Sequence, residues 1–267
     1  MKTFKTFINE RAIDAVKIID FLEGGTIEYI DDQENYVKRD ITVNDLFEFV
    51  DKHFEAKTLG EGSYALVKKG AVGEDYILKV TKREDKAYER YTEVAMSKHD
   101  GNPLYPHILY SGTINGVPFS AQEVKVYLIE HLTIDEMRVN ASSDYSSFRL
   151  FREANLIYRL CNKMQPFKYD LDENDEVDVL DGMEFLKDPN IHKHKFEHVI
   201  KAAGLLDSIE NLGIRIKDLE SWFGDYNKYF SGTNGSFPLD LHEKNLGWRK
   251  NGRCVFFDPI FSAGWHV

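Results

Sequence analysis

Between Ala56 and Leu132 the sequence breaks into short β-prone runs that glycines separate. The runs are AKTL, ALVKK, YILKV, HILYSG and VKVYLIEHL, and a helix-prone stretch from Glu84 to Lys98 lies between the third and the fourth. Short runs bounded by turn residues are typical of antiparallel strands. The pattern therefore predicts the order β-β-β-α-β-β, which begins with a three-stranded meander and ends with a hairpin at Asn115-Gly116.

Helical periodicity precedes this region. The chain opens with apolar residues at helical spacing that stop at Gly24-Gly25, which predicts an amphipathic helix, and a short strand is expected over residues 26–30. Thr42 and Asp45 have the spacing of a capping box, so a second helix is expected to start there and to end near His53.

Beyond Leu132 the periodicity is mostly helical. Two apolar stripes, Phe196 to Ile209 and Leu219 to Tyr226, each predict a helix. The acidic stretch from Asp170 to Gly182 is expected to be a solvated loop. The chain closes with two short β-prone runs, LGWRK and CVFFD, around the turn signal Asn251-Gly252.

Composition limits the classes of function. With 267 residues, 42% of them hydrophobic, the chain can bury a substantial core. A net charge of −11 repels a phosphate backbone, so non-specific nucleic-acid binding is not expected. No apolar run approaches membrane-spanning length and the first residues lack a signal-peptide core, so we expect no membrane association and a cytoplasmic location. Cys161 and Cys254 lack CxxC spacing and are expected to be reduced core residues.

A glycine-rich segment, GEGSYA, lies between the first two predicted strands. Gly60 and Gly62 have no side chains, so backbone N–H groups there could approach phosphate oxygens. Alone, the segment is better explained as a glycine-rich hairpin turn. Phosphate binding gains support from Lys79, which lies inside an apolar strand one hairpin later in the chain.

An ammonium group within an apolar strand requires an anionic partner, because burying an unpaired charge is costly. The helix that follows Lys79 offers two candidates, Glu93 and Glu89. We prefer Glu93 because Met96 and Ser97 continue its face of the helix. The alternative for either glutamate is a solvated helix surface.

A second group of polar residues lies near the end of the chain, in DLHEKN and VFFDP. Asp240 and Asn245 are five positions apart on one predicted loop, so the carboxylate could orient a hydroxyl nucleophile while the amide oxygen coordinates Mg²⁺. Asp258 ends an apolar strand and must find a cation or hydrogen-bond donors, which would complete a metal site. For the loop alone, a capping aspartate and a turn asparagine are serious alternatives.

The order of these parts is glycine-rich hairpin, strand lysine, helix glutamate, two strands, helices, Asp-x4-Asn loop, hairpin and aspartate, as in protein kinases. It predicts an α+β, two-lobed kinase-like fold with a small antiparallel β lobe plus helix and a reduced helical C-lobe. We expect an N-terminal helical extension at 1–54, an N-lobe at 55–132 and a C-lobe at 133–267. Only nine residues follow Asp258, so a full activation segment and the distal helices are expected to be missing.

Several runs, KTLGEGSYALV, YILKVTKREDKAY, HILYSG, DLHEKNLGW and VFFDPIFS, resemble the early serine/threonine protein kinases of short-tailed lytic phages of the T-seven type. The resemblance covers roughly residues 54–132 and 237–262. In that family the kinase domain modifies host proteins early in infection. The chain has Pro238 where typical kinases have His, and Pro259 where they have the Phe of Phe-Gly, and the phage family shares both changes.

The resemblance implies an ATP- and Mg²⁺-dependent serine/threonine protein kinase that acts on host proteins in the host cytoplasm. Lys79, positioned by Glu93, would hold the α- and β-phosphates, and Asp240 would orient the acceptor hydroxyl. Asn245 and Asp258 would hold Mg²⁺. The residues that would cover the phosphates are Gly60, Gly62 and Ser63. The residues that would meet the adenine edge are Glu130, His131 and Leu132.

Two other functions remain open. The DLHxxN form of the loop also resembles aminoglycoside and choline phosphotransferases, which share the lobes but phosphorylate small molecules. A non-catalytic kinase-like module that binds and inhibits a host protein is the second alternative. The simultaneous presence of Lys79, Asp240, Asn245 and Asp258 argues against that module, because binding alone has no chemical need for all four, whereas the missing peptide-binding helices argue for it.

Two metal-like patterns are interpreted as surface features. The acidic residues of 170–181 have calcium-loop spacing, but Asp175 replaces the turn glycine and the last position is Asp rather than Glu. His194 and His198 lie one helical turn apart near His192, without a third ligand at zinc spacing. A solvated loop and surface histidines are therefore expected.

Overall fold

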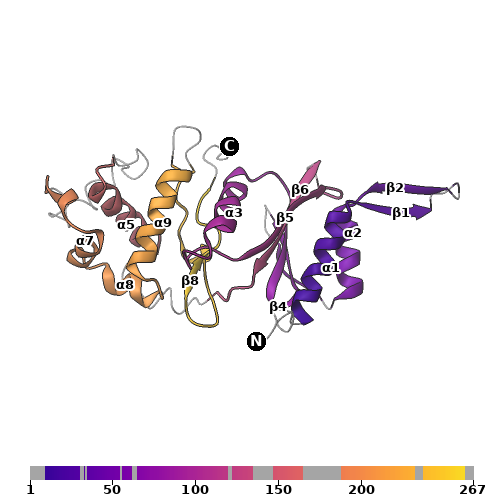
Figure 1. The fold of residues 1–267 in the computed structure, drawn as a ribbon, viewed down its shortest axis with the longest axis horizontal. Helices are drawn as coiled ribbons and strands as arrows, with labels where there is room; N and C mark the ends of the chain where they lie inside the picture. Colours follow the sequence, from indigo (N-terminus) through magenta and orange to yellow (C-terminus); the bar gives the residue numbers. More distant parts are fainter. Residues whose placement is uncertain are drawn as a thin grey trace, which may run out of the picture. The chain divides into compact units, whose positions relative to one another are not determined.

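The computed structural model describes residues 10–30, 33, 35–54, 56–61, 65–119, 122–134, 147–164, 188–231 and 237–261 (Figure 1). The chain divides into two compact units. Unit 1 comprises Met1–Lys86 and His107–His131, and unit 2 comprises Ala87–Pro106 and Leu132–Val267. Residues 1–54 belong to the same compact unit as the sheet. The predicted N-terminal extension over these residues stays a prediction.

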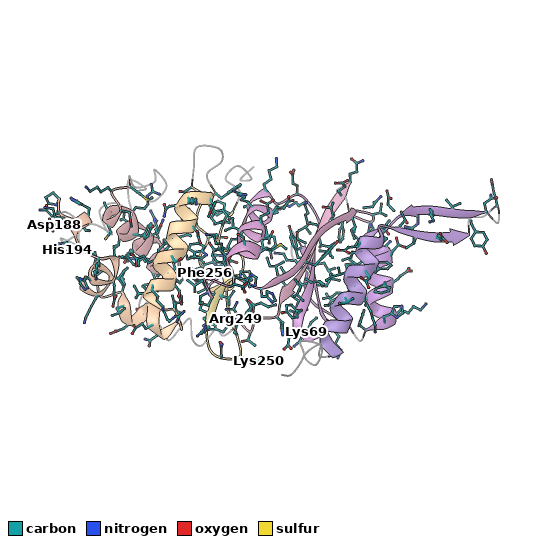
Figure 2. The ribbon with its side chains drawn as sticks, viewed as in Figure 1. Lys69, Asp188, His194, Arg249, Lys250 and Phe256 are labelled. Atoms are coloured by element: carbon teal, nitrogen blue, oxygen red, sulfur yellow. The ribbon has the colours of Figure 1, made fainter. Side chains whose placement is uncertain are left out.

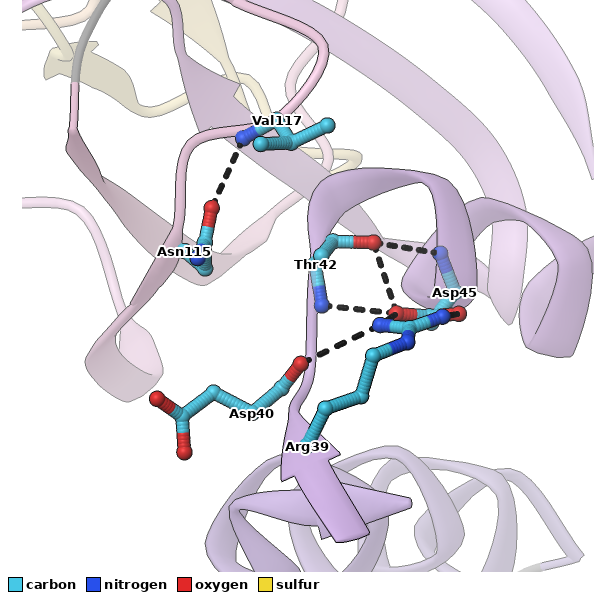
Figure 3. Close-up of polar contacts among 6 residues, drawn as sticks. All are labelled: Arg39, Asp40, Thr42, Asp45, Asn115 and Val117. Carbon is cyan, nitrogen blue, oxygen red and sulfur yellow. Dashed lines mark hydrogen bonds and ion pairs between the residues drawn. The ribbon is translucent and has the colours of Figure 1, made fainter. Parts of the chain in front are cut away.

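Unit 1 is built on a four-stranded antiparallel sheet with the order β3-β4-β6-β5. Its strands are β3 (Lys57–Glu61), β4 (Ala65–Thr81), β5 (Ile108–Asn115) and β6 (Glu123–Glu130). The pairing of β5 with β6 confirms the hairpin predicted at Asn115-Gly116. Asn115 Oδ1 accepts a hydrogen bond from the Val117 N–H at 3.1 Å, which closes the first turn of the connection (Figure 3).

The prediction of two separate strands, ALVKK and YILKV, is wrong in one respect. The structure assigns residues 65–81 to one strand, β4, without a break. The first part of β4 pairs with β3 at Leu66 to Lys69, and its last part pairs with β6 at Tyr76 to Val80. Gly70 has a φ of 90°, which lets the backbone change direction there without ending the strand.

Helices α1 (Glu10–Gly24) and α2 (Val43–His53) pack on unit 1's sheet beside β4 (Figure 1). Their apolar faces share one core with β4, β5 and β6, and the fully buried members contribute about 1.5–3 kcal/mol each. The buried residues of this core are Ala15, Ile18, Leu22, Val43, Leu46, Val50, Leu78, Val80, Ile114, Val124, Val126 and Leu128. Gly25, at φ 68°, follows α1 and confirms the predicted stop.

The start of α2 confirms the predicted capping box (Figure 3). The Asp45 N–H donates to Thr42 Oγ1 at 3.3 Å, and the Thr42 N–H donates to Asp45 Oδ2 at 2.8 Å. Arg39 at the end of the ribbon β1 (Thr26–Ile30) and β2 (Tyr36–Asp40) donates to both oxygens of Asp45. Burial alone would raise the pKa of Asp45, but hydrogen bonds from Arg39 and Thr42 outweigh it and lower this pKa to about 2.

Unit 2 is mostly helical. It contains α3 (Lys86–Lys98, whose first residue is counted with unit 1), α5 (Ser147–Cys161), α7 (Phe196–Ala202), α8 (Leu206–Asn211) and α9 (Ile216–Tyr229), with the short turns η3 (Ile191–Lys193) and η4 (Glu243–Asn245). Its two-stranded sheet pairs β7 (Leu246–Trp248) with β8 (Cys254–Phe256) around Gly252, as the sequence predicts. No helix among the described residues is long and apolar enough to cross a membrane.

The apolar stripe from Phe196 to Ile209 forms two helices rather than the one predicted. α7 ends before Gly204, which has a φ of 72°. The Leu205 N–H donates to the Ile200 carbonyl at 3.1 Å, the long return bond of a glycine-terminated helix. Gly204 therefore redirects the chain into α8 although the apolar spacing continues.

An aromatic cluster in unit 2 fixes β8 against the helices. The Trp222 ring of α9 stacks on Tyr226 at 5.6 Å between centroids and meets Phe256 of β8 edge-on at 5.0 Å. The Phe151 ring of α5 also meets Phe256 edge-on, at 5.2 Å between centroids. The Tyr91 hydroxyl of α3 also donates to the Phe256 carbonyl. The strand that leads to Asp258 is thus held by three helices. The predicted α+β class, helices with small antiparallel sheets, is confirmed, and its kinase-like character stays a prediction.

Candidate functional site

The glycine-rich segment of unit 1 joins β3 to β4 as a hairpin, as predicted. Gly60 in β3 pairs with Val67, and Glu61 pairs with Leu66. Residues 62–64 lie outside the described part of the chain, so the predicted phosphate-covering residues Gly62 and Ser63 have no structural description. Gly60 lies near the end of β3, a position that is compatible with a simple turn and also with a segment that covers phosphates.

Lys79 lies in β4 directly opposite Tyr127 of β6. Its neighbours Leu78 and Val80 are fully buried under α1 and α2, and alternation along a strand places Lys79 on the opposite face of the sheet. The Lys79 side chain is half-buried there, beside the buried Tyr127 ring. A half-buried ammonium on this face is suited to hold an anion, because its charge is partly desolvated.

Glu93 lies in α3, and its carboxylate forms an ion pair with Arg90 at 3.0 Å while 66% of its side chain is exposed. Met96 and Ser97, which share its face, are also exposed, whereas Glu89 is half-buried. The shared face that made Glu93 the preferred partner of Lys79 is therefore a solvent face. The pairing of Lys79 with either glutamate stays a prediction.

Glu130 ends β6, and its backbone and side chain both bind the loop before β5. The Glu130 N–H donates to the His107 carbonyl at 2.9 Å, and Glu130 Oε1 accepts from the His107 N–H at 2.8 Å. The His131 N–H donates to the Asp75 carbonyl at 2.7 Å. Among the described residues, the Leu132 N–H has no acceptor, so it is the one N–H of this predicted adenine edge left for a ligand.

In unit 2, residues 132–133 lie alongside β7. The Thr133 N–H donates to the Trp248 carbonyl at 3.0 Å, and the Trp248 N–H donates back to Thr133 at 2.9 Å. Gly247 permits this approach, because a Cβ at that position would lie 2.6 Å from Leu132 Cβ. The strand that continues from Asn245 thereby fixes Leu132.

The loop from Asp240 to Asn245 is closed by hydrogen bonds inside the loop. Asn245 is only 8% exposed, and its Nδ2 donates to the Asp240 carbonyl at 2.7 Å and to Asp240 Oδ2 at 3.1 Å. The Asn245 N–H donates to the His242 carbonyl at 2.9 Å, which forms the turn η4. About a third of the Asp240 side chain is exposed, so its carboxylate can meet a substrate.

Asp258 follows β8, and two backbone hydrogen bonds join its neighbours to the two ends of that loop. The Phe257 N–H donates to the Asn245 carbonyl at 3.1 Å, and the Asp240 N–H donates to the Pro259 carbonyl at 2.7 Å. The structure therefore brings Asp240, Asn245 and the half-buried Asp258 into one region of unit 2. Burial, and then the charges of neighbouring tyrosines and of Asp258, raise the pKa of Tyr91.

The donor set of this region fits Mg²⁺. This ion prefers oxygen ligands and takes one or two from the protein, with phosphate oxygens and water completing its shell. Among the described residues, Asn245 Oδ1 accepts no hydrogen bond, and Asp258 offers a carboxylate on the adjacent segment. No group of three or more His, Cys, Asp or Glu in the described ranges is placed to hold a metal, but a site with one asparagine and one aspartate is not of that kind.

Two residues whose side chains make contacts in this part of unit 2 were not singled out by the sequence. His242 lies inside the Asp240–Asn245 loop, and its spacing within DLHEKN was the available signal. Arg249, which follows β7, donates from its guanidinium to the carbonyls of Pro103 at 2.6 Å and Tyr105 at 2.9 Å (Figure 2). No sequence pattern connects Arg249 to a segment about 140 residues earlier.

The histidines, the acidic stretch and the cysteines were not assigned to the site from the sequence. His194 Nε2 lies 3.7 Å from Asp188 Oδ2, both side chains being largely exposed (Figure 2), and His198 is exposed as expected. The acidic stretch 170–182 lies outside the described residues. Both cysteines are free thiols: Cys254 is buried, and Cys161 is half-buried. Burial raises the pKa of Cys161 to about 11, so its thiolate is disfavoured.

No known protein-family profile matches the chain, and no curated protein sequence matches it. Among solved structures the chain is similar to the streptomycin-ATP-APH(2")-IIa ternary complex. The similarity has a TM-score of 0.31 and 13% sequence identity, and it covers 82% of this chain and 72% of the other.

Proposed function

We propose that the protein is an ATP- and Mg²⁺-dependent phosphotransferase whose acceptor is a serine or threonine hydroxyl of a protein. The observation that carries this proposal is the loop in which Asn245 holds the Asp240 carboxylate, with Asp258 on the adjacent segment. A carboxylate held in one orientation beside two oxygen ligands for Mg²⁺ is the set of groups that phosphoryl transfer requires.

In the reaction, the bond between the γ-phosphorus of ATP and the bridging oxygen breaks, and a new bond forms to the acceptor oxygen. Asp240 orients the acceptor hydroxyl and receives its proton, which then passes to solvent. Bound with ATP, Mg²⁺ would neutralise charge on the phosphate oxygens, with Asn245 and Asp258 as its protein ligands.

We assign nucleotide binding to residues of unit 1 and to Leu132. Lys79 would hold the α- and β-phosphates, and the backbone of the segment from Gly60 to Ser63 would cover them. At the adenine edge, the Leu132 N–H is the available donor, because those of Glu130 and His131 bind the protein itself. The resemblance of the sequence to phage kinases makes proteins of a bacterial host the first acceptors to test.

The test is incubation of the purified protein with γ-labelled ATP and Mg²⁺ in three arms: bacterial lysate, casein, and a mixture of choline and an aminoglycoside. The proposal predicts labelled protein bands on phosphoserine or phosphothreonine. Label only in a small molecule would replace the protein acceptor with a small-molecule acceptor. Absence of transfer in all arms, and to the protein itself, would contradict the enzymatic function.

A further inference from the structure

His242 has two ring nitrogens with different neighbours, and these neighbours fix the position of its proton. Nδ1 lies 3.2 Å from the backbone N of Lys244 and accepts its hydrogen bond, which caps η4. A ring nitrogen that accepts a hydrogen bond carries no proton. The proton of the neutral His242 ring is therefore on Nε2.

In the described part of the chain, two polar atoms lie near Nε2. Asn245 Nδ2 is at 3.1 Å, and Asp240 Oδ1 is at 3.6 Å. Asn245 Nδ2 donates to the Asp240 carbonyl oxygen, which can only accept, so the amide orientation of Asn245 is fixed. Two donors cannot form a hydrogen bond, so Asp240 Oδ1 is the acceptor that the described residues offer to the Nε2 proton.

The two oxygens of Asp240 then face different donors. Oδ2 accepts from Asn245 Nδ2 at 3.1 Å, and Oδ1 faces His242 Nε2. A separation of 3.6 Å is longer than a hydrogen bond, so the proposal requires this contact to shorten in the reactive complex. Catalytic hydrogen bonds are often long without substrate and shorten in the reactive complex.

We propose that His242 is a positioning residue for phosphoryl transfer, whose Nε2–H holds Oδ1 of Asp240 while Asn245 holds Oδ2. The inference rests on the proposed function of Asp240. An ionised carboxylate has about four acceptor sites, so two donors leave room for the acceptor hydroxyl. With both oxygens held, the carboxylate has one orientation toward the acceptor hydroxyl before the substrate binds.

His242 also caps η4, so its structural role must be separated from its positioning role. Two variants do this because the amides of Asn and Gln reach different distances. In His242→Asn, Oδ1 occupies the position of Nδ1 and keeps the cap, but no donor reaches Asp240. In His242→Gln, the Nε2 donor reaches Asp240, but the cap is lost.

The kinetic experiment measures kcat and KM with Mg·ATP and casein, together with thermal melting and calorimetric affinity for Mg·ATP. Loss of a hydrogen bond to a charged group that matters in the transition state predicts a kcat about tenfold lower or more for His242→Asn. Its affinity for Mg·ATP and its melting temperature should match the wild type. His242→Gln should keep kcat near the wild type even if it melts earlier. Normal kcat in His242→Asn, with loss in His242→Gln, would overturn the proposal.

The position of the proton is measured without turnover. The ¹⁵N chemical shifts of His242 in labelled protein distinguish the two neutral tautomers, and Nε2–H is expected. A proton on Nδ1 in an active enzyme overturns this inference alone. A wild type that transfers no phosphate to bacterial lysate, to casein, to choline with an aminoglycoside, or to itself contradicts the proposed function, and the positioning role falls with it.

Discussion

The side chain of Asn245 donates to both the backbone carbonyl and the carboxylate of Asp240, at 2.7 Å and 3.1 Å. The Asn245 amide nitrogen therefore holds the Asp240 carboxylate, while the Asn245 amide oxygen is directed away from these two contacts. This division leaves the Asn245 amide oxygen for the Mg²⁺ that we propose Asn245 binds. The relationship requires the five-residue spacing, because η4 turns the chain back between the two residues.

Asn245→Ala should weaken the dependence of ATP affinity on Mg²⁺, because it removes one of two protein ligands. The measurement is calorimetry of ATP binding with and without Mg²⁺. Lys244→Ala is the matched control, since Lys244 is exposed on the same turn and should bind Mg·ATP as the wild type does. Equal ATP affinity with and without Mg²⁺ in the wild-type protein would remove the metal site.

Lys79→Met should abolish phosphotransfer while preserving the fold, because we propose that the ammonium holds phosphate and because Met fills a similar volume. Lys69→Met is the control, because Lys69 (Figure 2) lies in the same strand but pairs with Lys57 of β3. Transfer assays and melting curves are run on both proteins. Full activity in Lys79→Met would refute the assignment.

The partner of Lys79 can be identified by comparing Glu89→Gln with Glu93→Gln. If the sequence-based preference is right, Glu93→Gln should lower transfer, and Glu89→Gln should not. The half-buried position of Glu89 and the Arg90 ion pair of Glu93 make this comparison informative. Loss of transfer in Glu89→Gln alone would show that the preferred pairing is wrong.

Gly247→Ala should destabilise unit 2 by about 1–3 kcal/mol, the usual cost of overpacking. The added methyl would lie 2.6 Å from Leu132 Cβ, which cannot move without its backbone. Gly101→Ala is the control, since its nearest neighbour is an ordinary contact at 3.7 Å. Urea unfolding measures both. A Gly247→Ala protein as stable as the control would show that residues 132–133 do not pack on β7.

Unit 1 should lose stability in acid through Asp45. Its folded pKa of about 2 lies below the ordinary 3.8, so the contribution is present above about pH 4 and is lost as pH falls toward 2. We expect roughly 1–2 kcal/mol, because the partner Arg39 is partly exposed and solvent screens the pair. Asp45→Asn should remove this pH dependence, and the exposed Asp20→Asn should not. Identical acid unfolding of the two variants would contradict the assignment.

Local signals in the sequence predicted most elements of the fold. The capping box at Thr42, the end of α1 at Gly25 and the β7–β8 turn at Gly252 depend on neighbours in the chain, so they could be read from spacing. The division of the Phe196 to Ile209 stripe was missed because apolar periodicity continues through Gly204. Periodicity reports the buried face, whereas the positive φ of one glycine decides where the helix ends.

The sequence proposes the residues of the candidate site but predicts only part of their contacts. Asp240, Asn245 and the segment of Asp258 meet in unit 2 because the β7–β8 hairpin returns the chain to the loop. Met96, which made Glu93 the preferred partner of Lys79, is 42% exposed despite its apolar side chain, so apolar character alone did not report the exposure of this face of α3. Contacts such as Arg249 with the Pro103 carbonyl depend on distant backbone atoms, which leave no pattern in the sequence.

The most direct measurement of the central claim compares Asp240→Asn with the wild type for Mg·ATP affinity and phosphotransfer. Asp240 acts on the acceptor hydroxyl, so the variant should bind Mg·ATP nearly normally and transfer phosphate slower by roughly a hundredfold or more. The substitution retains the backbone carbonyl that accepts from Asn245 Nδ2, so the loop should keep its closure. Wild-type rates of transfer in Asp240→Asn would contradict the account.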